Sequence, residues 1–204
     1  AARLAVRGRI PTVFQPHAWS FDAAEGIVRS AAVAWERFGA RWADAVVCVS
    51  VAEKQHGIEH GIEARWRVEP NGVDLEAFSE ASAAERAAAR ERLALPRGPL
   101  ALCVGRLSRQ KGQDVLLSAW PSVTRRVPDA ELFVVGSGPE EQRLKSMAPP
   151  GVHFAGQRDD VEEWLAATNL VVLPSRWEGL SIGLLEALAR GRSVVATDVA
   201  GARE

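Results

Sequence analysis

Two glutamates stand eight positions apart in the stretch EGLSIGLLE, residues 178–186. Ser181 is a good N-cap residue, and the apolar spacing after it predicts a helix. Glu178 then lies in the loop before that helix, and Glu186 lies roughly 7 Å beyond the cap at about 1.5 Å per residue. A carboxylate accepts hydrogen bonds from a vicinal diol, so one Glu could bind a ribose and the other a sugar, with a diphosphate at the helix start between them. The alternative is an acidic cap at Glu178 and a solvated helix face at Glu186.

A second candidate is the basic loop VGRLSRQKG, residues 104–112, which follows a predicted strand and precedes a predicted helix. It carries Gly105, Arg106, Lys111 and Gly112. Free backbone N–H groups, the positive end of the helix dipole and two cations would converge there, which favours an anion and most simply a diphosphate. The loop could instead be a solvated basic turn.

His17 and a pair of glycines complete the candidates. The stretch TVFQPH predicts a strand over 12–17 that ends at His17, whose imidazole would then project at the carboxyl edge of a sheet, where open α/β folds bind ligands. A structural histidine is the alternative. The run VVGSGPEE contains Gly136 and Gly138 but lacks the third glycine of a dinucleotide fingerprint, so it favours a tight turn over a cofactor site.

Behind these residues, the later part of the chain alternates short β-branched runs with helical patterns, as βαβ units of a parallel sheet do. Strands are expected at 100–105, 131–136, 152–156, in NLVVLP at 169–174 and in SVVATD at 193–198, with a helix over 112–126 that Pro121 should kink or interrupt. The fold class is therefore α/β and doubly wound.

The earlier part has a different organisation that is also α/β. It has a predicted helix over 24–43, a buried strand in ADAVVCVS and a helix near 51–60, before a turn cluster in VEPNGVD. We place a domain junction close to residue 70, which divides the chain into 1–69 and 70–204. The chain lacks an initiator Met and stops directly after a strand, which predicts truncation at both ends.

Composition narrows the functional classes. A net charge of -1 with scattered basic residues does not suggest binding to nucleic acid. Cys48 and Cys103 lie in separate apolar runs, without metal or redox spacing, and are predicted to be buried strand residues. No signal peptide or membrane-spanning run is visible, which favours a cytoplasmic protein and allows only peripheral contact with the inner face of a membrane.

Taken together, these segments resemble the retaining GT-B glycosyltransferases of family four, which transfer a sugar from a nucleotide-sugar donor. The resemblance implies two Rossmann-like domains, both incomplete here. It spans nearly the whole chain and is carried by PTVFQPH, ADAVVCVS, VEPNGVD, VGRLSRQKG, VVGSGP, PSRWEGLSIGLLEALARG and ATDVAGARE.

The resemblance implies a role for each candidate residue. Arg106 and Lys111, with Gly105 beside them, would bind the donor diphosphate, Glu178 would hold the donor sugar and Glu186 the ribose. Further donor contacts would come from Gly179, Leu180, Ser181, Gln157 and Arg158. His17 would reach the transferred sugar from the N-terminal domain. No metal or other cofactor is implied, because cations and a helix dipole would stabilise the leaving group.

The implied partners are a nucleotide-diphosphate sugar and a sugar, lipid-linked or small-molecule acceptor. The family's Gly-rich loop near the N-terminus and its last helices have no counterpart here, so we expect this chain alone to bind donor weakly and not to turn over. Two alternatives stay open: a non-catalytic sugar-nucleotide-binding module and a GT-B sugar-nucleotide epimerase.

Overall fold

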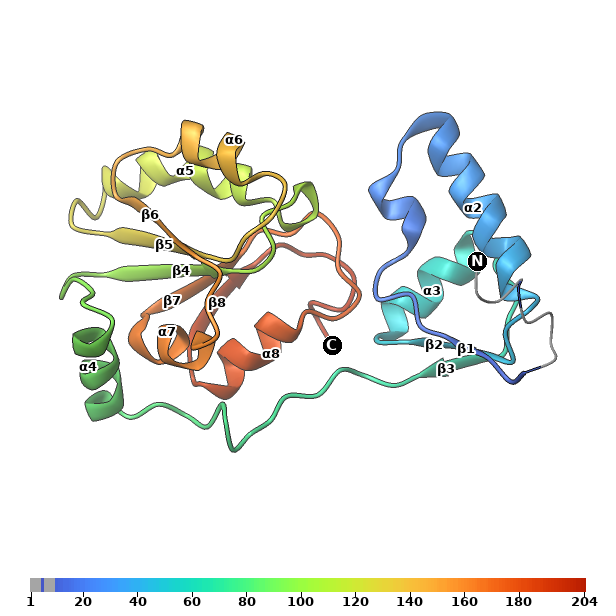
Figure 1. The fold of residues 1–204 in the computed structure, drawn as a ribbon, viewed down its shortest axis with the longest axis horizontal. Helices are drawn as coiled ribbons and strands as arrows, with labels where there is room; N and C mark the ends of the chain where they lie inside the picture. The colour runs from blue at the N-terminus through green and yellow to red at the C-terminus, as the bar shows by residue number, and fades with distance from the viewer. Residues whose placement is uncertain (1–4, 6–9) are drawn as a thin grey trace. The chain divides into compact units, whose positions relative to one another are not determined.

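The computed structural model describes residue 5 and residues 10–204 as two compact units. The first unit contains residues up to Asn71 together with Trp177–Ser181 and Asp198–Glu204. The second contains Gly72–Arg176 and Ile182–Thr197. Each unit has its own parallel sheet, so the prediction of an α/β fold is confirmed (Figure 1).

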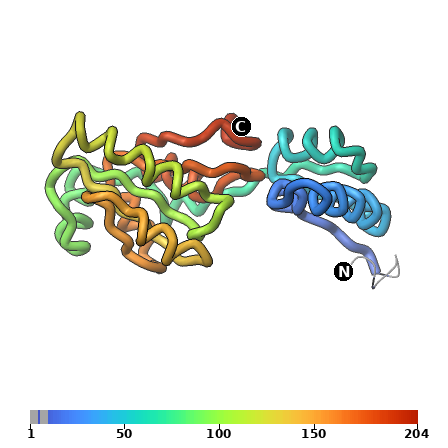
Figure 2. The backbone as a smooth tube through the Cα atoms, turned by 90° about the horizontal axis from the view of Figure 1, so that it is seen from above, coloured from blue at the N-terminus to red at the C-terminus, as the bar shows by residue number. Residues whose placement is uncertain are grey.

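The first sheet has three parallel strands in the order β1-β2-β3, formed by Val13–Phe14, Ala45–Cys48 and Trp66–Val68. Helices α2 (Gly26–Ala40) and α3 (Val51–Glu59) lie next to one another in both views, and Arg37 of α2 donates to the carbonyl of His60 at 2.6 Å (Figures 1 and 2). The core of this unit is aromatic: Trp19 stacks on Phe21 and contacts Trp66 edge-on.

The predicted strand over 12–17 is too long. Strand β1 ends at Phe14, and His17 lies three residues beyond it with φ 50°. Pro16 explains the early end, because proline has no N–H for the ladder and restricts the residue before it. A short 3-10 helix, η1 (Ser20–Ala23), follows this turn. Strand β3 was not predicted from the sequence.

The second sheet has five parallel strands in the order β6-β5-β4-β7-β8. The strands are β4 (Leu100–Val104), β5 (Glu131–Val135), β6 (Val152–Gly156), β7 (Leu170–Leu173) and β8 (Ser193–Ala196). All five overlap runs that the sequence predicts, and Cys103 in β4 is buried, as is Cys48 in β2.

Helices cover both faces of this sheet. Helices α5 (Gln113–Thr124) and α6 (Glu141–Met147) lie on one face, and α4 (Ala83–Arg92), α7 (Val161–Ala167) and α8 (Ile182–Ala189) lie on the other (Figure 1). A capping box at Ser82 and Glu85 starts α4. Helix α5 continues through Pro121, so the predicted interruption is wrong; the last turn closes through a bond from the Arg125 N–H to the Pro121 carbonyl at 3.3 Å.

The order of the strands reverses at β4, which is flanked by β5 and β7. The chain moves outward from β4 through β5 to β6, and then returns to build β7 and β8 on the opposite side. In open α/β sheets, ligands bind outside the carboxyl ends of the strands at such a switch point. The loops that follow β4 and β7 are therefore the first place to look for a site.

Candidate functional site

The loop after β4 is the basic loop singled out in the sequence. Gly105 starts it with φ 148° and Gly112 ends it with φ 64°, both in the region that favours glycine. Between them Arg109–Lys111 form the 3-10 helix η2, and α5 begins at Gln113. The exposed Arg106 and the partly buried Lys111 therefore belong to one short strand-to-helix connection.

Lys111 lies over the start of this loop. A Cβ atom added at Gly105 would lie 3.7 Å from both Cδ and Cε of Lys111, which is ordinary contact distance. The ammonium group also acts on the buried Cys103 thiol beneath it: burial raises the pKa of Cys103 to about 12, and the positive charge of Lys111 opposes that rise. Lys111 is thus held against the end of β4.

Gln113 is a supporting residue that the sequence analysis missed. It is 1% exposed at the start of α5, and its Nε2 donates to the carbonyl of Arg106 at 3.0 Å. This bond ties both ends of the basic loop together. The signal was present in the sequence as a polar residue immediately after Lys111-Gly112.

The start of the loop after β7 is fixed to the basic loop. Arg176 donates to both carboxylate oxygens of Asp114 at 2.8 Å, and its backbone N–H donates to the carbonyl of Gln110 at 2.7 Å. The hydrogen bonds from Arg176 hold the pKa of Asp114 below its usual value. A Cβ at Gly112 would lie 2.0 Å from the carbonyl oxygen of Pro174, so the two loops meet backbone to backbone.

The loops after β5 and β6 lie beside the basic loop, at the carboxyl ends of the strands of the second sheet. A Cβ at Gly136 would lie 2.0 Å from the carbonyl oxygen of Gly105, and one at Gly138 would lie 2.3 Å from that of Leu107. The two glycines therefore serve close backbone packing, which agrees with the tight-turn interpretation. Gln157 reaches the same edge, where its Oε1 accepts from the Ser137 hydroxyl at 3.0 Å.

Arg158 is already engaged within its own loop. Its guanidinium donates to the two carboxylate oxygens of Asp160 at 2.9 and 2.6 Å, and it lies 6.0 Å from the ring centroid of Trp164. The Asp160 carboxylate raises the pKa of Arg158. A direct contact from Arg158 to a donor would have to compete with this pair.

Glu186 lies in the second turn of α8. Burial raises the pKa of its carboxyl group, and the negative charge of Glu162 on the neighbouring helix α7 adds to that rise. A partly desolvated carboxylate gains from hydroxyl donors that replace its lost water. This environment suits the binding of a diol better than a solvated helix face would.

The remaining candidates belong to the first unit, where His17 and Glu178 lie near one another along the backbone. A Cβ at Gly179 would lie 3.2 Å from the backbone nitrogen of Ala18, so the segments that carry His17 and Glu178 touch. Asn71 donates to the carbonyl of Leu180 at 2.8 Å. Ser181 directly precedes α8, as expected for an N-cap residue.

The candidates thus form two groups, each within one unit. The second unit contains Gly105, Arg106, Lys111, Gln157, Arg158 and Glu186, and the first contains His17, Glu178, Gly179, Leu180 and Ser181.

Among the described residues, no three of the His, Cys, Asp and Glu side chains are arranged to hold a metal ion. Likewise, no helix in the part of the chain that the structure describes is both long and apolar enough to span a bilayer.

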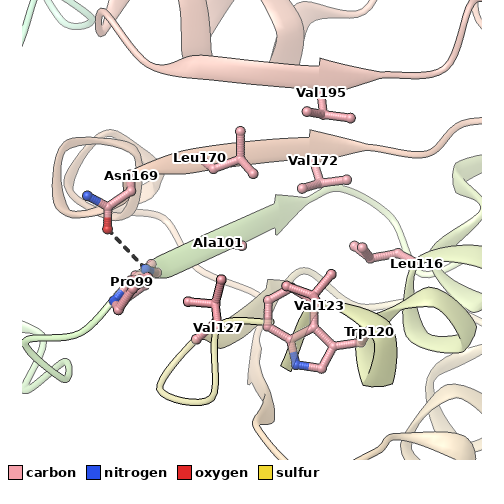
Figure 3. A pocket seen from close by; sticks show the side chains of 12 residues that line it. Pro99, Ala101, Leu116, Trp120, Val123, Val127, Asn169, Leu170, Val172 and Val195 are labelled. Carbon is pink, nitrogen blue, oxygen red and sulfur yellow. Dashed lines mark hydrogen bonds between the residues drawn. The ribbon is translucent and has the colours of Figure 1, made fainter. Parts of the chain in front are cut away.

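A separate groove of about 380 Å³ lies where β4, β7 and β8 face α5 (Figure 3). Its lining includes Trp120, Val172 and Val195, and the only polar residue there, Asn169, accepts from the Leu100 N–H at 3.0 Å. Pro99 and Asn169 immediately precede β4 and β7, so this groove reaches the amino ends of the strands. An apolar surface without charge does not suit a diphosphate.

Solved structures share this fold. The structure of Anabaena Alr3699/HepE in complex with UDP-glucose matches with a TM-score of 0.83 and 25% identity, over 99% of this chain and 57% of the other. WaaG, a glycosyltransferase involved in lipopolysaccharide biosynthesis, matches with a TM-score of 0.76 and 24% identity, over 95% of this chain and 59% of the other. Two parallel α/β units with this likeness define the GT-B class of glycosyltransferases.

Two family descriptions match the sequence itself. "Glycosyl transferases group 1" matches residues 98–204, and "Glycosyltransferase Family 4" matches residues 1–77. The first match alone covers more than half of the chain. The chain belongs to the group 1 glycosyl transferases, family four.

Curated relatives are longer than this chain. A GDP-mannose-dependent monoacylated alpha-(1-6)-phosphatidylinositol monomannoside mannosyltransferase of Corynebacterium glutamicum is 37% identical over 66% of this chain and 39% of its own length. The lipopolysaccharide core biosynthesis mannosyltransferase LpsB of Rhizobium meliloti is 32% identical over 81% of this chain and 48% of its own length. The chain therefore spans less than half the length of these two relatives.

Proposed function

We propose that this chain is the donor-binding portion of a retaining glycosyltransferase that moves a hexose from a nucleotide-diphosphate sugar to an acceptor hydroxyl. Residues 70–204 would form the donor domain, and residues 1–69 would belong to the acceptor-side domain. The pathway would be the synthesis of a polysaccharide, a glycolipid or a small glycoside. The acceptor would be a sugar, a lipid-linked molecule or a small molecule, and a lipid-linked acceptor would bring the protein to a membrane surface.

The observation that carries the proposal is the basic loop at the switch point of the second sheet. Arg106 and Lys111 lie in a loop whose ends are joined by Gln113 and whose glycines allow close backbone approach. Fixed cations beside a helix start bind a diphosphate and neutralise the charge that develops when it leaves. A preformed loop loses little entropy on binding.

Glu186 supports the sugar-nucleotide part of the proposal. Its carboxylate is partly buried beside a second carboxylate, an arrangement that costs stability and that hydrogen bonds from a ribose diol would relieve. Glu178 would bind the donor sugar, and the turn Gly179–Ser181 would contact sugar and phosphate through its backbone. Gln157, which bonds Ser137, would lie near the base.

His17 and Glu178 would act on the transferred sugar. In the proposed reaction the bond between the anomeric carbon and the diphosphate oxygen breaks, the acceptor oxygen bonds to that carbon, and the acceptor proton passes to the departing phosphate. Front-face attack of this kind would give retention. The chain's own residues bind, orient and neutralise charge, and no described residue pair is needed as a glycosidase-type couple.

The relatives guide the choice of donor to test first. The Corynebacterium glutamicum relative is GDP-mannose-dependent and a mannosyltransferase, whereas the Anabaena structure holds UDP-glucose. We therefore propose GDP-mannose as the first donor to test and UDP-glucose as the second.

The test is a donor screen on the full-length protein, with mass detection of the released nucleotide, together with calorimetric titration of GDP and UDP. Lys111→Ala should weaken binding of the preferred nucleoside diphosphate by roughly tenfold or more, because a charge-assisted bond is lost. Lys145→Ala is the matched control, since that lysine pairs with Glu141 on α6 at 2.7 Å. Equal affinities in the two variants would contradict the assignment of the loop.

A further inference from the structure

We propose that Glu53 is a positioning residue for the transfer reaction. It holds the turn that carries His17, and the turn that carries Glu178 packs against it. This inference rests on the proposed function, because His17 and Glu178, the residues that Glu53 would position, have a role only in the proposed sugar transfer. The spacing Ser50-Val-Ala-Glu53 marks Glu53 only as a residue of a helix start, and it lies in the first turn of α3.

Glu53 is a buried carboxylate whose two oxygens serve two different segments. Glu53 is 2% exposed. Oε1 accepts from the Ala18 N–H at 2.5 Å, and Oε2 accepts from the Val49 N–H at 2.8 Å. One oxygen therefore anchors the turn after β1, and the other anchors the end of β2.

The turn that Glu53 holds has an unfavourable backbone. His17 and Ala18 have φ angles of 50° and 79°, and two consecutive non-glycine residues in this region are uncommon. Such a conformation persists only when its surroundings fix it, and it is frequent at functional sites. Here the Glu53 oxygen supplies the acceptor for the second of the two strained residues.

The next residue is anchored by the same part of α3. Trp19 is 2% exposed, and its Nε1 donates to the backbone carbonyl of Glu53 at 2.9 Å. Phe14, before the turn, tilts against the same indole ring at a centroid distance of 6.3 Å. The turn is thus fixed at both ends by the aromatic core and in its middle by the Glu53 carboxylate.

The turn that carries Glu178 is seated on the same carboxylate. A Cβ at Gly179 would lie 2.8 Å from Glu53 Oε1, 2.7 Å from Val49 Cγ2 and 3.2 Å from the Ala18 nitrogen. Gly179 leaves no room for a side chain, so its backbone lies directly against the group that holds Ala18. His17 and Glu178 are each one residue away from this contact, and a shift of Glu53 would move both.

The simpler role for Glu53 is to cap α3. Ser50 accepts from the Glu53 N–H at 3.0 Å, and the bond from Val49 to the Glu53 carboxylate lies at the same helix end. Capping alone would not require the bond to Ala18, which is 35 positions away in the sequence. This difference separates the two roles experimentally.

The experiment compares three variants of the full-length protein. Glu53→Gln keeps the size of the side chain but replaces one acceptor oxygen with a donor, so one of the two amides loses its partner. Ser50→Ala removes the cap of α3 and leaves the bond to Ala18. Ala18→Gly, combined with Glu53→Gln, makes the φ of 79° accessible without the carboxylate.

We expect Glu53→Gln to lower kcat by about tenfold or more while KM for the donor changes by less than about threefold, because misplacement of reacting groups affects the transition state most. Ala18→Gly should restore a large part of kcat in the Glu53→Gln background. Ser50→Ala should keep kcat. If Glu53→Gln does not accumulate in folded form, Glu53→Asp, which is one methylene shorter, is measured with the same expectations.

Two kinetic results would overturn the inference: an unchanged kcat in folded Glu53→Gln, or no recovery on adding Ala18→Gly. Amide hydrogen exchange of Ala18 gives a readout that needs no turnover. Its protection should fall in Glu53→Gln and persist in Ser50→Ala, and equal protection in both refutes the holding role. A wild-type protein that transfers no sugar from any nucleotide donor contradicts the proposed function instead, and the exchange measurement still decides the role of Glu53.

Discussion

At Glu186, stability and binding make opposite demands on one side chain. Burial and the nearby Glu162 raise the pKa of its carboxyl group. A raised pKa in the folded state means that the folded protein favours the protonated form, so stability is lost as pH rises through that pKa. The ionised form, however, is the one that accepts hydrogen bonds from a diol.

We therefore predict that Glu186→Gln stabilises the unliganded protein near pH 7 and weakens donor binding. The stabilisation should be at most about 1 kcal/mol, because the carboxylate is only partly buried, and it should vanish below the ordinary pKa of glutamate. Donor affinity should fall by roughly tenfold. Thermal unfolding at two pH values and calorimetric titration of the donor measure the two effects.

Glu162→Gln is the matched control for this prediction. It removes the neighbouring charge that raises the pKa of Glu186 while leaving that carboxylate in place. Donor binding by the wild type should weaken as pH falls through the raised pKa of Glu186, and Glu162→Gln should move this loss to lower pH. A pH profile that is identical in both proteins would contradict the coupling between the two glutamates.

At the scale of elements, the basic loop depends on glycine backbone that no other residue can replace. Gly112 has φ 64°, and a Cβ there would lie 2.0 Å from the carbonyl oxygen of Pro174. Gly156, at the end of β6, has a similar φ of 73°, but nothing lies within 4 Å of its Cβ position. The two positions share backbone strain and differ in the steric clash.

We predict that Gly156→Ala lowers the free energy of unfolding by about 1 kcal/mol, the cost of a left-handed alanine. Gly112→Ala should cost more than about 3 kcal/mol or displace the loop after β7, because strain and overlap add. Chemical denaturation measures both variants, and nucleoside diphosphate titration reports on the loop. Equal costs for the two substitutions would show that Pro174 moves away freely.

At the scale of the whole molecule, the chain contains two sheets with separate cores. Val46 in β2 is fully buried in the aromatic core of the first unit, and Leu132 in β5 is fully buried in the second unit. Two units with their own cores unfold as one transition only when their interface couples them strongly. Substitution within each core therefore tests how far they unfold separately.

We predict that Leu132→Ala shifts the melting transition of the second sheet, with a cost of about 3–5 kcal/mol, and leaves that of the first sheet nearly unchanged. Val46→Ala should act on the first sheet alone. Calorimetry gives the transitions, and the variant that shifts a transition assigns it to its own core, since Val46 and Leu132 lie in different cores. Coincident shifts of a single transition in both variants would contradict separate unfolding.

Much of the second sheet could be predicted from the chain because its strands are continuous apolar runs that end in glycine or polar turns. The run LALCVG, at residues 100–105, became β4. The first sheet was harder to predict. β3 has only three residues, and β1 stops at Phe14, because Pro16 ends a pattern that otherwise reads as a strand to His17.

The sequence by itself determined the fold class, the family and the two carboxylates and two cations proposed to bind the donor, because these depend on local periodicity and on residue types at fixed spacing. Only the tertiary structure decided what supports them. Gln113 closes the basic loop, Arg176 joins the loop after β7 to Gln110 and Asp114, and Glu53 reaches Ala18 across 35 positions. Such contacts join residues that are distant in the chain or have no periodic signal, so the packing of the sheets and their loops brings them together.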